Sequence, residues 1–280
     1  MKYLKNEPLR KHTSFKIGGP ADYFCVVTDL DELREALAFS KDKKLKVFIL
    51  GAGSNLLIAD HGLRGLVIKV AFSWIKQENK IIRVGAGVPL TKLLKHLTER
   101  ELTGLEFLAG VPGSIGGAVV MNAGAWDENI SRYVQAVLVV DQKGREKILN
   151  NKQLGFRYRK SKLQSGKLVV VEVVLKLLPG KKTKIKEKIK ANLALRRAKQ
   201  PLDKPSCGSV FKNPRGKHAG YLIEQAGLRG LRVGDAEVSK KHGNFILNLG
   251  KAKASDVMKL IARIKKTVKV KLEPEVKILQ

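Results

Sequence analysis

Residues 104–126 are unlike any ordinary helix or strand, because six of them are glycine and none between Ala109 and Trp126 is charged. Glycine inside a helix or strand costs about 0.5–1 kcal/mol relative to alanine, so it is expected where φ is positive or where a ligand approaches the main chain. An uncharged stretch of this kind predicts a buried or ligand-covered surface. A flat aromatic cofactor lying on main-chain amides would explain it, and a tight turn entering a buried helix is the alternative.

A second glycine-rich turn comes earlier in the chain, directly after an apolar segment. Residues 47–50 read VFIL, which predicts a buried strand, and residues 51–57 read GAGSNLL. Successive backbone amides in such a turn can hold anionic oxygens, and the side chains of Ser54 and Asn55 add donors. We expect a pyrophosphate here, although a bare hairpin turn explains the pattern equally well. The turn is neither a Walker loop nor a GxGxxG dinucleotide motif.

The length and the net charge of the chain limit the classes of function that it can have. With 280 residues the chain can bury a sizeable core and is long enough for about two domains. The formal net charge is +30, but most of it is lysine spread along the chain, and no zinc-finger or RNP motif accompanies it. Such lysine runs are usually solvated faces, so we expect no nucleic-acid partner. A basic surface also suits small polyanions that carry phosphates and carboxylates.

Three features indicate the compartment. Two cysteines, Cys25 and Cys207, form neither a CxxC pair nor a disulfide framework, which suits a reducing environment. The first residues, MKYLKNE, are too charged for a secretory signal. The longest apolar runs, such as residues 168–174, fall far short of the ~20 residues of a membrane span. We expect a cytoplasmic monomer that does not cross a membrane.

The remaining patterns predict the helices and strands in outline. Strands are expected at Tyr23–Val27, Val47–Leu50, Gly65–Val70, Lys80–Val84, Val134–Asp141, Glu146–Leu149, Leu168–Leu178 and Gly243–Asn248. Helices are expected at Glu32–Lys43 with Asp29 or Asp31 as cap, at Leu90–Arg100, Thr183–Lys199 and Ala219–Ala226, and from a cap at Ser255 to about Lys269. Residues 142–145, QKGR, predict a hairpin, and Pro179-Gly180 predicts a domain boundary.

Six motifs, taken in order, resemble one enzyme family. They are TSFKIGGPAD at 13–22, GAGSNLL at 51–57, AGVPGSIGGAVVMNAGA at 109–125, FRYRKS at 156–161, CGSVFKNP at 207–214 and LEPEV at 272–276. Over nearly the whole chain they resemble the UDP-N-acetylenolpyruvoylglucosamine reductases (MurB), flavoenzymes of peptidoglycan synthesis and cell-wall biogenesis, in their shorter type II form. No position that matches a catalytic residue of the family departs from its pattern.

The resemblance implies an α+β fold in three parts. A two-subdomain FAD-binding fold of the vanillyl-alcohol oxidase (PCMH) class would occupy residues 1–70 and 71–180, and a C-terminal α+β substrate domain residues 181–280. The 51–57 loop contains no His or Cys, so we expect FAD to be bound non-covalently. The residues implied to hold FAD are Gly51, Ala52, Gly53, Ser54, Asn55, Leu56, Gly110, Val111, Pro112, Gly113, Ser114, Gly116, Gly117, Asn122 and Ala123.

The reaction implied is the reduction of the enolpyruvyl ether of UDP-N-acetylglucosamine to UDP-N-acetylmuramate, with NADPH as co-substrate and FAD as hydride carrier. Negative charge would develop beside the substrate carboxylate and spread into it. An oxidoreductase of this class needs the protein to stabilise that charge and to supply a proton, because the cofactor performs the redox chemistry.

Three residues match the family's catalytic positions. Arg159 would fork onto the substrate carboxylate and stay cationic, and Ser209 would donate the proton as general acid. Glu275 would either orient Arg159 or, if protonated, donate a hydrogen bond, and the sequence leaves both roles open. Tyr158, Lys212, Asn213, His242 and Asn244 resemble substrate-contacting positions.

Other residues of reactive type receive simpler interpretations. Cys207 has no evident base beside it and is expected to pack in the core. The remaining histidines show no ligand spacing, so no metal site is expected; they are His12, His61, His96 and His218.

Two alternative functions stay open at this stage. One is a different FAD oxidoreductase on the same fold, which would have no reason to carry Arg159, Ser209 and Glu275 together. The other is a basic nucleic-acid-binding protein without catalysis, which the flavin spectrum of the purified protein would argue against.

Overall fold

The computed structural model describes all 280 residues, which pack into two compact units. The first contains Met1–Lys5, Tyr23–Ala52 and Gly65–Leu195, and the second contains Asn6–Asp22, Gly53–Arg64 and Arg196–Gln280. Neither unit is continuous in sequence. The predicted division into residues 1–70, 71–180 and 181–280 is a finer one and stays a prediction.

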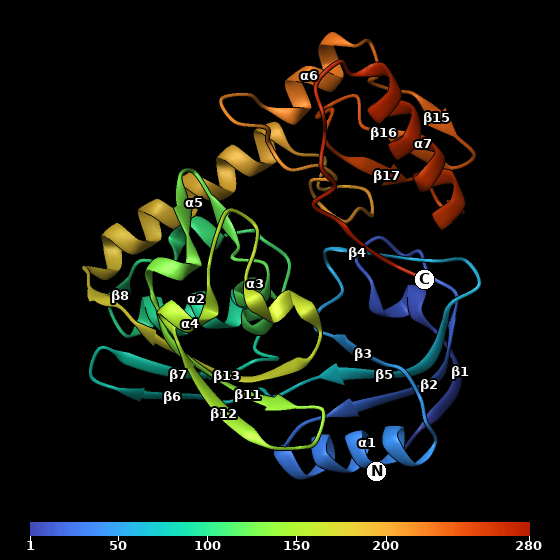
Figure 1. Cartoon of the computed structure of the whole chain (residues 1–280). Coiled ribbons are helices and arrows are strands. Elements are labelled where there is room, and N and C mark those ends of the chain that lie inside the picture. Colours follow the sequence, from blue (N-terminus) through green and yellow to red (C-terminus); the bar gives the residue numbers. More distant parts are fainter. The chain divides into compact units, whose positions relative to one another are not determined.

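A four-stranded sheet with the strand order β1-β2-β5-β3 forms one layer (Figure 1). Its strands are β1 (Leu4–Pro8), β2 (Pro20–Val27), β5 (Leu63–Val70) and β3 (Val47–Leu50), and β3 runs parallel to β5. Helix α1 (Leu30–Asp42) packs on it through Leu33 and Leu37, which are buried together with Ile68. Asp29 caps α1 by accepting from Glu32 N at 2.8 Å, so the first of the two predicted caps is confirmed.

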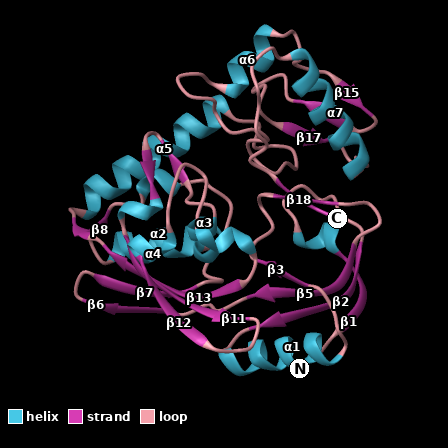
Figure 2. Ribbon diagram, viewed as in Figure 1, coloured by secondary structure: helices cyan, strands magenta, loops and turns pink.

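The rest of the first unit is built on a five-stranded antiparallel sheet with the order β12-β11-β13-β7-β6 (Figure 2). Helices α2 (Leu90–Glu99) and α3 (Ile115–Val120) lie on one side of it. The strands are β12 (Glu146–Asn150), β11 (Val134–Asp141), β13 (Leu168–Lys176), β7 (Ile81–Gly85) and β6 (Ile75–Glu78).

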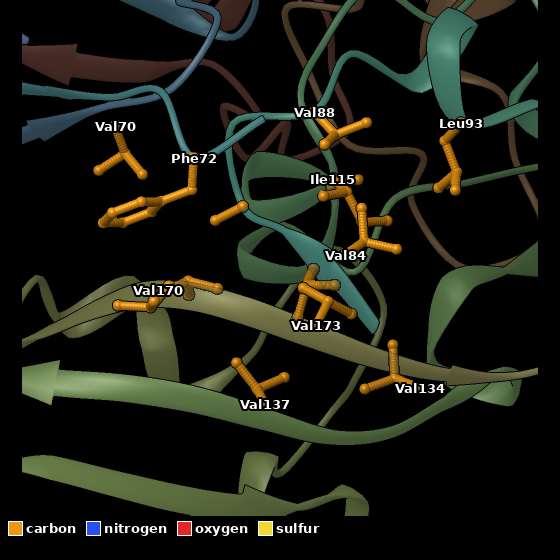
Figure 3. Close-up of a cluster of buried hydrophobic side chains, with 14 of the residues drawn as sticks. Val70, Phe72, Val84, Val88, Leu93, Ile115, Val134, Val137, Val170 and Val173 are labelled. Atoms are coloured by element: carbon orange, nitrogen blue, oxygen red, sulfur yellow. The ribbon is translucent and has the colours of Figure 1, made fainter. Parts of the chain in front are cut away.

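A row of valines forms the core under α3. Val84 of β7 pairs with Val173 of β13, which also pairs with Val137 of β11. Figure 3 shows this row with Ile115 of α3 above it, and all four side chains are fully buried. β-Branched residues suit such positions because they are stiff and fill a pleated surface closely. The core therefore fixes α3, the helix that the uncharged glycine stretch enters.

The second unit has a separate core. Its sheet is β15 (Arg232–Val233), β16 (Ala236–Val238) and β17 (Ile246–Asn248), and α7 (Ala254–Thr267) packs with it through Val257, Leu260 and Ile261. Helix α6 (Ala219–Gln225) contributes Ile223 to the same core. Strand β4 (Leu56–Ile58) pairs in parallel with β18 (Lys277–Leu279), so the end of the chain joins the 53–64 segment.

The remaining elements complete the fold. They are η1 (Leu9–His12), β8 (Leu102–Thr103), η2 (Glu106–Leu108), β9 (Gly124–Ala125), β10 (Glu128–Asn129), η3 (Ile130–Arg132), α4 (Asn151–Leu154), η4 (Lys162–Ser165), β14 (Leu178–Pro179) and α5 (Lys182–Lys199). The boundary between the two units falls within α5. None of the helices is long and apolar enough to cross a membrane.

Most predicted elements are confirmed to within a few residues, including the hairpin of β11 and β12. Two need correction. The strand predicted at Gly243–Asn248 begins only at Ile246, because Phe245 N bonds back to His242 O in a turn. Ser255 does not cap the last helix, which starts at Ala254.

The start of α7 is capped by Asp256, whose Oδ2 accepts from Lys253 N at 3.1 Å, and also by a distant residue. The carboxylate of Asp60 accepts from Ala254 N at 2.6 Å and from Ser255 N at 3.0 Å. Because these two backbone donors are satisfied from outside the helix, Ser255 is free to lie inside the first turn. Burial raises the pKa of Asp60, but the hydrogen bonds from Ser255 and Ala254 outweigh it and lower that pKa below its ordinary value.

Replacing Asp60 with alanine is expected to cost about 1 kcal/mol of stability at pH 7, the usual effect of losing a helix cap. The folded-state pKa is lowered, so this contribution is present above the unfolded-state pKa and disappears as the pH falls through the folded-state value. Denaturant unfolding of the wild type and the variant, at pH 7 and at acid pH, measures the loss of stability under each condition. Asp42→Ala, at an exposed carboxylate paired with Lys43, should change stability by about 0.5 kcal/mol or less. An Asp60→Ala effect of equal size at both pH values would contradict the assignment.

Candidate active site

The uncharged glycine stretch forms a turn that is bonded along its length to the segment before α2. Leu90 N donates to Gly113 O at 3.0 Å, Ile115 N to Val88 O at 2.9 Å, and Gly116 N to Ala86 O at 2.9 Å. Ser114 then caps α3 by accepting from Gly117 N at 3.4 Å. The tight turn into a helix that the sequence offered as an alternative is therefore present, and it leaves open whether a cofactor also lies on it.

The glycines of this region serve different purposes. A Cβ built on Gly116 would lie 2.8 Å from Ala86 Cβ, so Gly116 is required by packing. A Cβ on Gly51 would lie 2.9 Å from Ser114 Oγ, and one on Gly117 would lie 3.5 Å from the same atom. Gly51 and Gly117, which belong to two separate motifs, thus lie close to one buried hydroxyl, that of Ser114. A neutral, backbone-rich surface of this kind fits a flat cofactor, because Gly51 and Gly117 add no side chain to it.

Arg159 is fixed next to the end of the same stretch. Its Nη2 donates to Gly124 O at 2.7 Å, and its guanidinium lies 5.2 Å from the centre of the exposed Tyr158 ring. Arg159 has a φ of +52°, in the left-handed region that few arginines adopt. Gln164 holds this conformation by donating from Nε2 to Arg159 O at 2.9 Å and to Val120 O at 3.2 Å.

Asn122 and Ser161 add two further ties between the Arg159 turn and the end of α3. Asn122 is buried, donates from Nδ2 to Arg157 O at 2.9 Å and accepts at Oδ1 from Ser131 N at 3.2 Å. The hydroxyl of Ser161 donates to Val120 O at 2.7 Å. The catalytic arginine predicted from the sequence therefore sits on a turn whose main chain is tied down at several points.

The second half of the 51–56 loop belongs to the other unit. Gly53 has a φ of +67°, and a Cβ there would lie only 2.0 Å from His12 O, so no other residue fits. Asn55 donates from Nδ2 to Glu275 O at 3.2 Å, and its carbonyl oxygen accepts from Lys277 N at 3.0 Å. The loop predicted to hold a pyrophosphate is thus bonded directly to the LEPEV motif.

The segment that carries Ser209 lies against two others in this unit. Ser209 forms an isolated antiparallel bridge with Phe245, and Val210 N donates to Asn244 O at 2.9 Å. On the other edge, Glu275 N donates to Val210 O at 2.8 Å. Ser209 and Glu275 therefore lie on neighbouring segments although 66 positions separate them in the sequence.

Four of the five predicted substrate residues lie on or next to this segment, and the fifth, Tyr158, lies in the first unit. Lys212 Nζ pairs with Glu273 Oε1 at 2.5 Å, and Asn213 accepts from Ala219 N at 3.0 Å, where α6 begins. His242 accepts at Nδ1 from Asn244 N at 3.2 Å and packs edge-on against Phe245. Burial lowers the pKa of His242, so its imidazole is neutral at physiological pH.

Both polar atoms of the Asn244 side chain bond to Phe211. Burial raises the pKa of Cys207 to about 12, which leaves the thiol protonated and fits its interpretation as a packing residue.

Each unit gathers its own share of the predicted site residues. The first holds Gly51, Ala52, Gly110, Val111, Pro112, Gly113, Ser114, Gly116, Gly117, Asn122, Ala123, Tyr158 and Arg159. The second holds Gly53, Ser54, Asn55, Leu56, Ser209, Lys212, Asn213, His242, Asn244 and Glu275. Sequence reasoning missed Gln164 and the partner role of Glu273. Ser161 is the last residue of the 156–161 motif, so the sequence pointed to it. Gln164 lies outside every motif, and nothing in the sequence indicated its role.

Two family models match the chain. A FAD binding domain matches residues 21–150, and the C-terminal domain of UDP-N-acetylenolpyruvoylglucosamine reductase matches residues 200–279. The fold and its neutral, glycine-lined surface therefore define a FAD-dependent oxidoreductase with a separate C-terminal domain.

Full-length relatives identify the family within that class. UDP-N-acetylenolpyruvoylglucosamine reductase 2 of Symbiobacterium thermophilum is 47% identical over 278 residues, which are 97% of this chain and 90% of that protein. The reductase of Desulforamulus reducens is 46% identical over 280 residues, covering 98% of this chain and 92% of the relative. The chain belongs to the UDP-N-acetylenolpyruvoylglucosamine reductase family.

A solved structure gives the same result for the fold. The crystal structure of the reductase from Thermus caldophilus superposes with a TM-score of 0.87 at 38% identity, over 100% of this chain and 98% of that one. The predicted fold class is confirmed: a FAD-binding fold of the vanillyl-alcohol oxidase class with a C-terminal α+β domain.

Alanine substitutions at the two adjacent glycines of α3 are expected to have opposite effects on the stability of the FAD-free protein. Gly116→Ala should destabilise it by about 1–3 kcal/mol, because the new methyl group overlaps Ala86. Gly117→Ala should stabilise it by about 0.5–1 kcal/mol, because its Cβ meets only ordinary contact distances and alanine favours the helix. Denaturant unfolding of both variants tests this, and equal shifts would show that Gly116 is not packed as described.

Proposed function

We propose that the chain catalyses the NADPH-dependent reduction of UDP-N-acetylglucosamine enolpyruvate to UDP-N-acetylmuramate, a step of peptidoglycan precursor synthesis. The observation that carries the proposal is the identity of 46% or more, over nearly the full length, to proteins named for this substrate. Arg159, Ser209 and Glu275 stand at the matching motif positions, and no residue of the three is missing.

FAD would be held by the two glycine-rich turns. Gly51 and Gly117 beside Ser114 would face the flavin, and Gly53 to Leu56 would present main-chain amides to the pyrophosphate. The bound cofactor supplies the two-electron chemistry of the reaction. The chain's contribution is to exclude charge from this surface, to bind the substrate carboxylate and to deliver a proton.

Arg159 would bind the substrate carboxylate. A guanidinium can fork onto two carboxylate oxygens and remains cationic throughout, so it stabilises the negative charge that spreads into this group during reduction. The bond from Nη2 to Gly124 O, together with the tie from Gln164, fixes where the guanidinium lies. Pre-organised charge of this kind needs no rearrangement as the reaction proceeds.

Ser209 would complete the reduction by protonation. The alkene gains a hydride at its terminal carbon and a proton at the adjacent carbon, and the Ser209 hydroxyl supplies that proton. Glu275, on the neighbouring segment, would either donate a hydrogen bond to the developing enolate or orient a cation beside it. Lys212, Asn213, Tyr158 and His242 would contact the nucleotide sugar, with Lys212 exchanging Glu273 for an anionic group of the substrate.

A cytoplasmic monomer completes the proposal. Cys25 and Cys207 are both buried free thiols, which suits a reducing compartment. Size-exclusion chromatography with light scattering tests the expected monomer.

The function is tested by adding NADPH and UDP-N-acetylglucosamine enolpyruvate to the purified yellow protein. We expect oxidation of NADPH that depends on the enolpyruvyl substrate, and a product heavier by two hydrogens. Reduction of the flavin by NADPH without reoxidation by this substrate would instead indicate a different FAD oxidoreductase. A protein without flavin absorbance that binds DNA in a salt-sensitive manner would contradict both.

Ser209→Ala is expected to leave flavin reduction by NADPH nearly unchanged and to slow alkene reduction by about 10²–10⁴-fold, the usual contribution of a general acid. Stopped-flow absorbance measures the two half-reactions separately. Ser206→Ala is a matched control three positions earlier, where the hydroxyl oxygen only accepts a 3.5 Å contact from Gly208 N. Equal slowing of both half-reactions by Ser209→Ala would reject the assignment.

Arg159→Lys is expected to slow alkene reduction by about 10- to 100-fold, because lysine cannot fork onto a carboxylate and the lost charged hydrogen bond is worth about 1.5–3 kcal/mol. Arg157→Lys, at an exposed position two residues earlier whose main chain forms the bonds to the site, serves as control. Turnover of Arg159→Lys close to that of the wild type would contradict this role.

A further inference from the structure

The buried side chain of Asn244 makes hydrogen bonds of the kind that a neighbouring strand would make to the segment of residues 209–211. Asn244 is 3% exposed and lies just before β17. Its Oδ1 accepts from Phe211 N at 2.9 Å, and its Nδ2 donates to Phe211 O at 2.8 Å. The N–H of Phe211 can only meet the oxygen of the amide, so the orientation of the side chain is fixed by its partners. One amide thus satisfies both polar main-chain groups of Phe211.

The main chain of Asn244 extends this contact toward Ser209. Val210 N donates to Asn244 O at 2.9 Å, and the next residue along, Phe245, forms the bridge with Ser209. Asn244 therefore makes three hydrogen bonds to the two residues that follow Ser209. On the opposite edge, Val210 O is bonded to Glu275 N.

We propose that Asn244 is a positioning residue that fixes the Ser209 hydroxyl for proton donation, an inference that rests on the proposed function. Phe211 is only 1% exposed, so water cannot replace a lost partner there. Leaving a buried donor or acceptor unpaired is destabilising, and the segment can recover that loss only by moving. Such a movement displaces Ser209, and a misplacement of about 1 Å can cost about 100-fold in rate.

This role differs from direct substrate contact, the role that the resemblance implied for Asn244. The amide is buried and already bonded on both of its polar atoms to Phe211. Its influence on the reaction therefore passes through the main chain of residues 209–211. The maximal rate of alkene reduction should change, while the affinity for the substrate should change little.

Asn248 provides a matched control in the same unit. It is 2% exposed, donates from Nδ2 to Phe15 O at 3.0 Å and accepts at Oδ1 from Gly250 N and Ala252 N at 2.8 and 3.1 Å. Its hydrogen bonds involve no residue between Ser209 and Asn213. Loss of its side chain should therefore destabilise the unit as much as loss of the Asn244 side chain does, but it should not displace Ser209.

The experiment compares Asn244→Ala and Asn248→Ala in the full-length, FAD-loaded enzyme. Both should lower the melting temperature. At saturating ligand, Asn248→Ala should leave both half-reactions within about twofold of the wild type. Asn244→Ala should leave flavin reduction by NADPH within about twofold and slow flavin reoxidation by the enolpyruvyl substrate about 10- to 100-fold.

A second variant, Asn244→Asp, keeps the shape of the side chain and covers the case in which the alanine variant does not fold. The ionised carboxylate can accept from Phe211 N but cannot donate to Phe211 O, whereas a protonated one can do both. Reoxidation should therefore be slow at neutral pH and should recover relative to the wild type as the pH falls.

Equal slowing of both half-reactions, or a weaker affinity for substrate with an unchanged maximal rate, would overturn the positioning role. The wild type in the same experiment separates this outcome from failure of the proposed function. If the wild-type enzyme does not reduce the alkene, the function itself is wrong. If it does and the Asn244 variants behave like Asn248→Ala, only the positioning role is wrong.

Discussion

The arrangement of the second unit depends on one constraint: buried main-chain groups must find partners, and here they find them across long stretches of sequence. Residues 209–212 are bonded on one edge to Asn244 and on the other to Glu273 and Glu275. The segment carrying Glu275 is itself bonded to Asn55, and β18 then pairs with β4. Ser209, Glu275 and residues 53–56 are therefore held by one connected set of hydrogen bonds. This set is complete only when the last residues of the chain are in place.

These hydrogen bonds explain why each unit is made of separate stretches of the sequence. Residues 53–64 begin only two residues after β3, yet they join the C-terminal unit because β4 pairs with β18 and Asp60 caps α7. The polypeptide crosses from one unit to the other within the 51–56 loop. Gly53 is the first residue of the second unit after this crossing, and its positive φ and the close approach of His12 O exclude any side chain there. The glycines of GAGSNLL thus have a structural purpose in addition to the cofactor contacts proposed for them.

Local patterns in the sequence predicted what is decided locally. The cap at Asp29 and the hairpin at 134–150 depend on residues close in the sequence, the apolar run at 47–50 is typical of a buried strand, and the structure agrees with all three. The cap of α7 was predicted wrongly because its acceptor, Asp60, lies 194 positions away from Ala254. The same applies to Gln164 and Asn244, whose partners depend on tertiary packing. For the site, the glycine stretch was visible in the composition, whereas the roles of Arg159, Ser209 and Glu275 came from the resemblance and from no periodicity.

The residues that fix the site segments share one chemical property. Asn122, Gln164, Asn55 and Asn244 are side-chain amides, and each donates to a main-chain oxygen of a segment that carries a proposed catalytic residue. An amide can donate and accept at once, so it can replace a missing strand neighbour where the backbone turns irregularly, as it does at the positive φ of Arg159. It does so without adding charge. A carboxylate or an ammonium group in any of these positions would place a further charge beside the segment that it holds, and charges interact strongly where water is excluded. Neutral amides therefore hold the segments that carry Arg159, Ser209 and Glu275 without placing a further charge beside them.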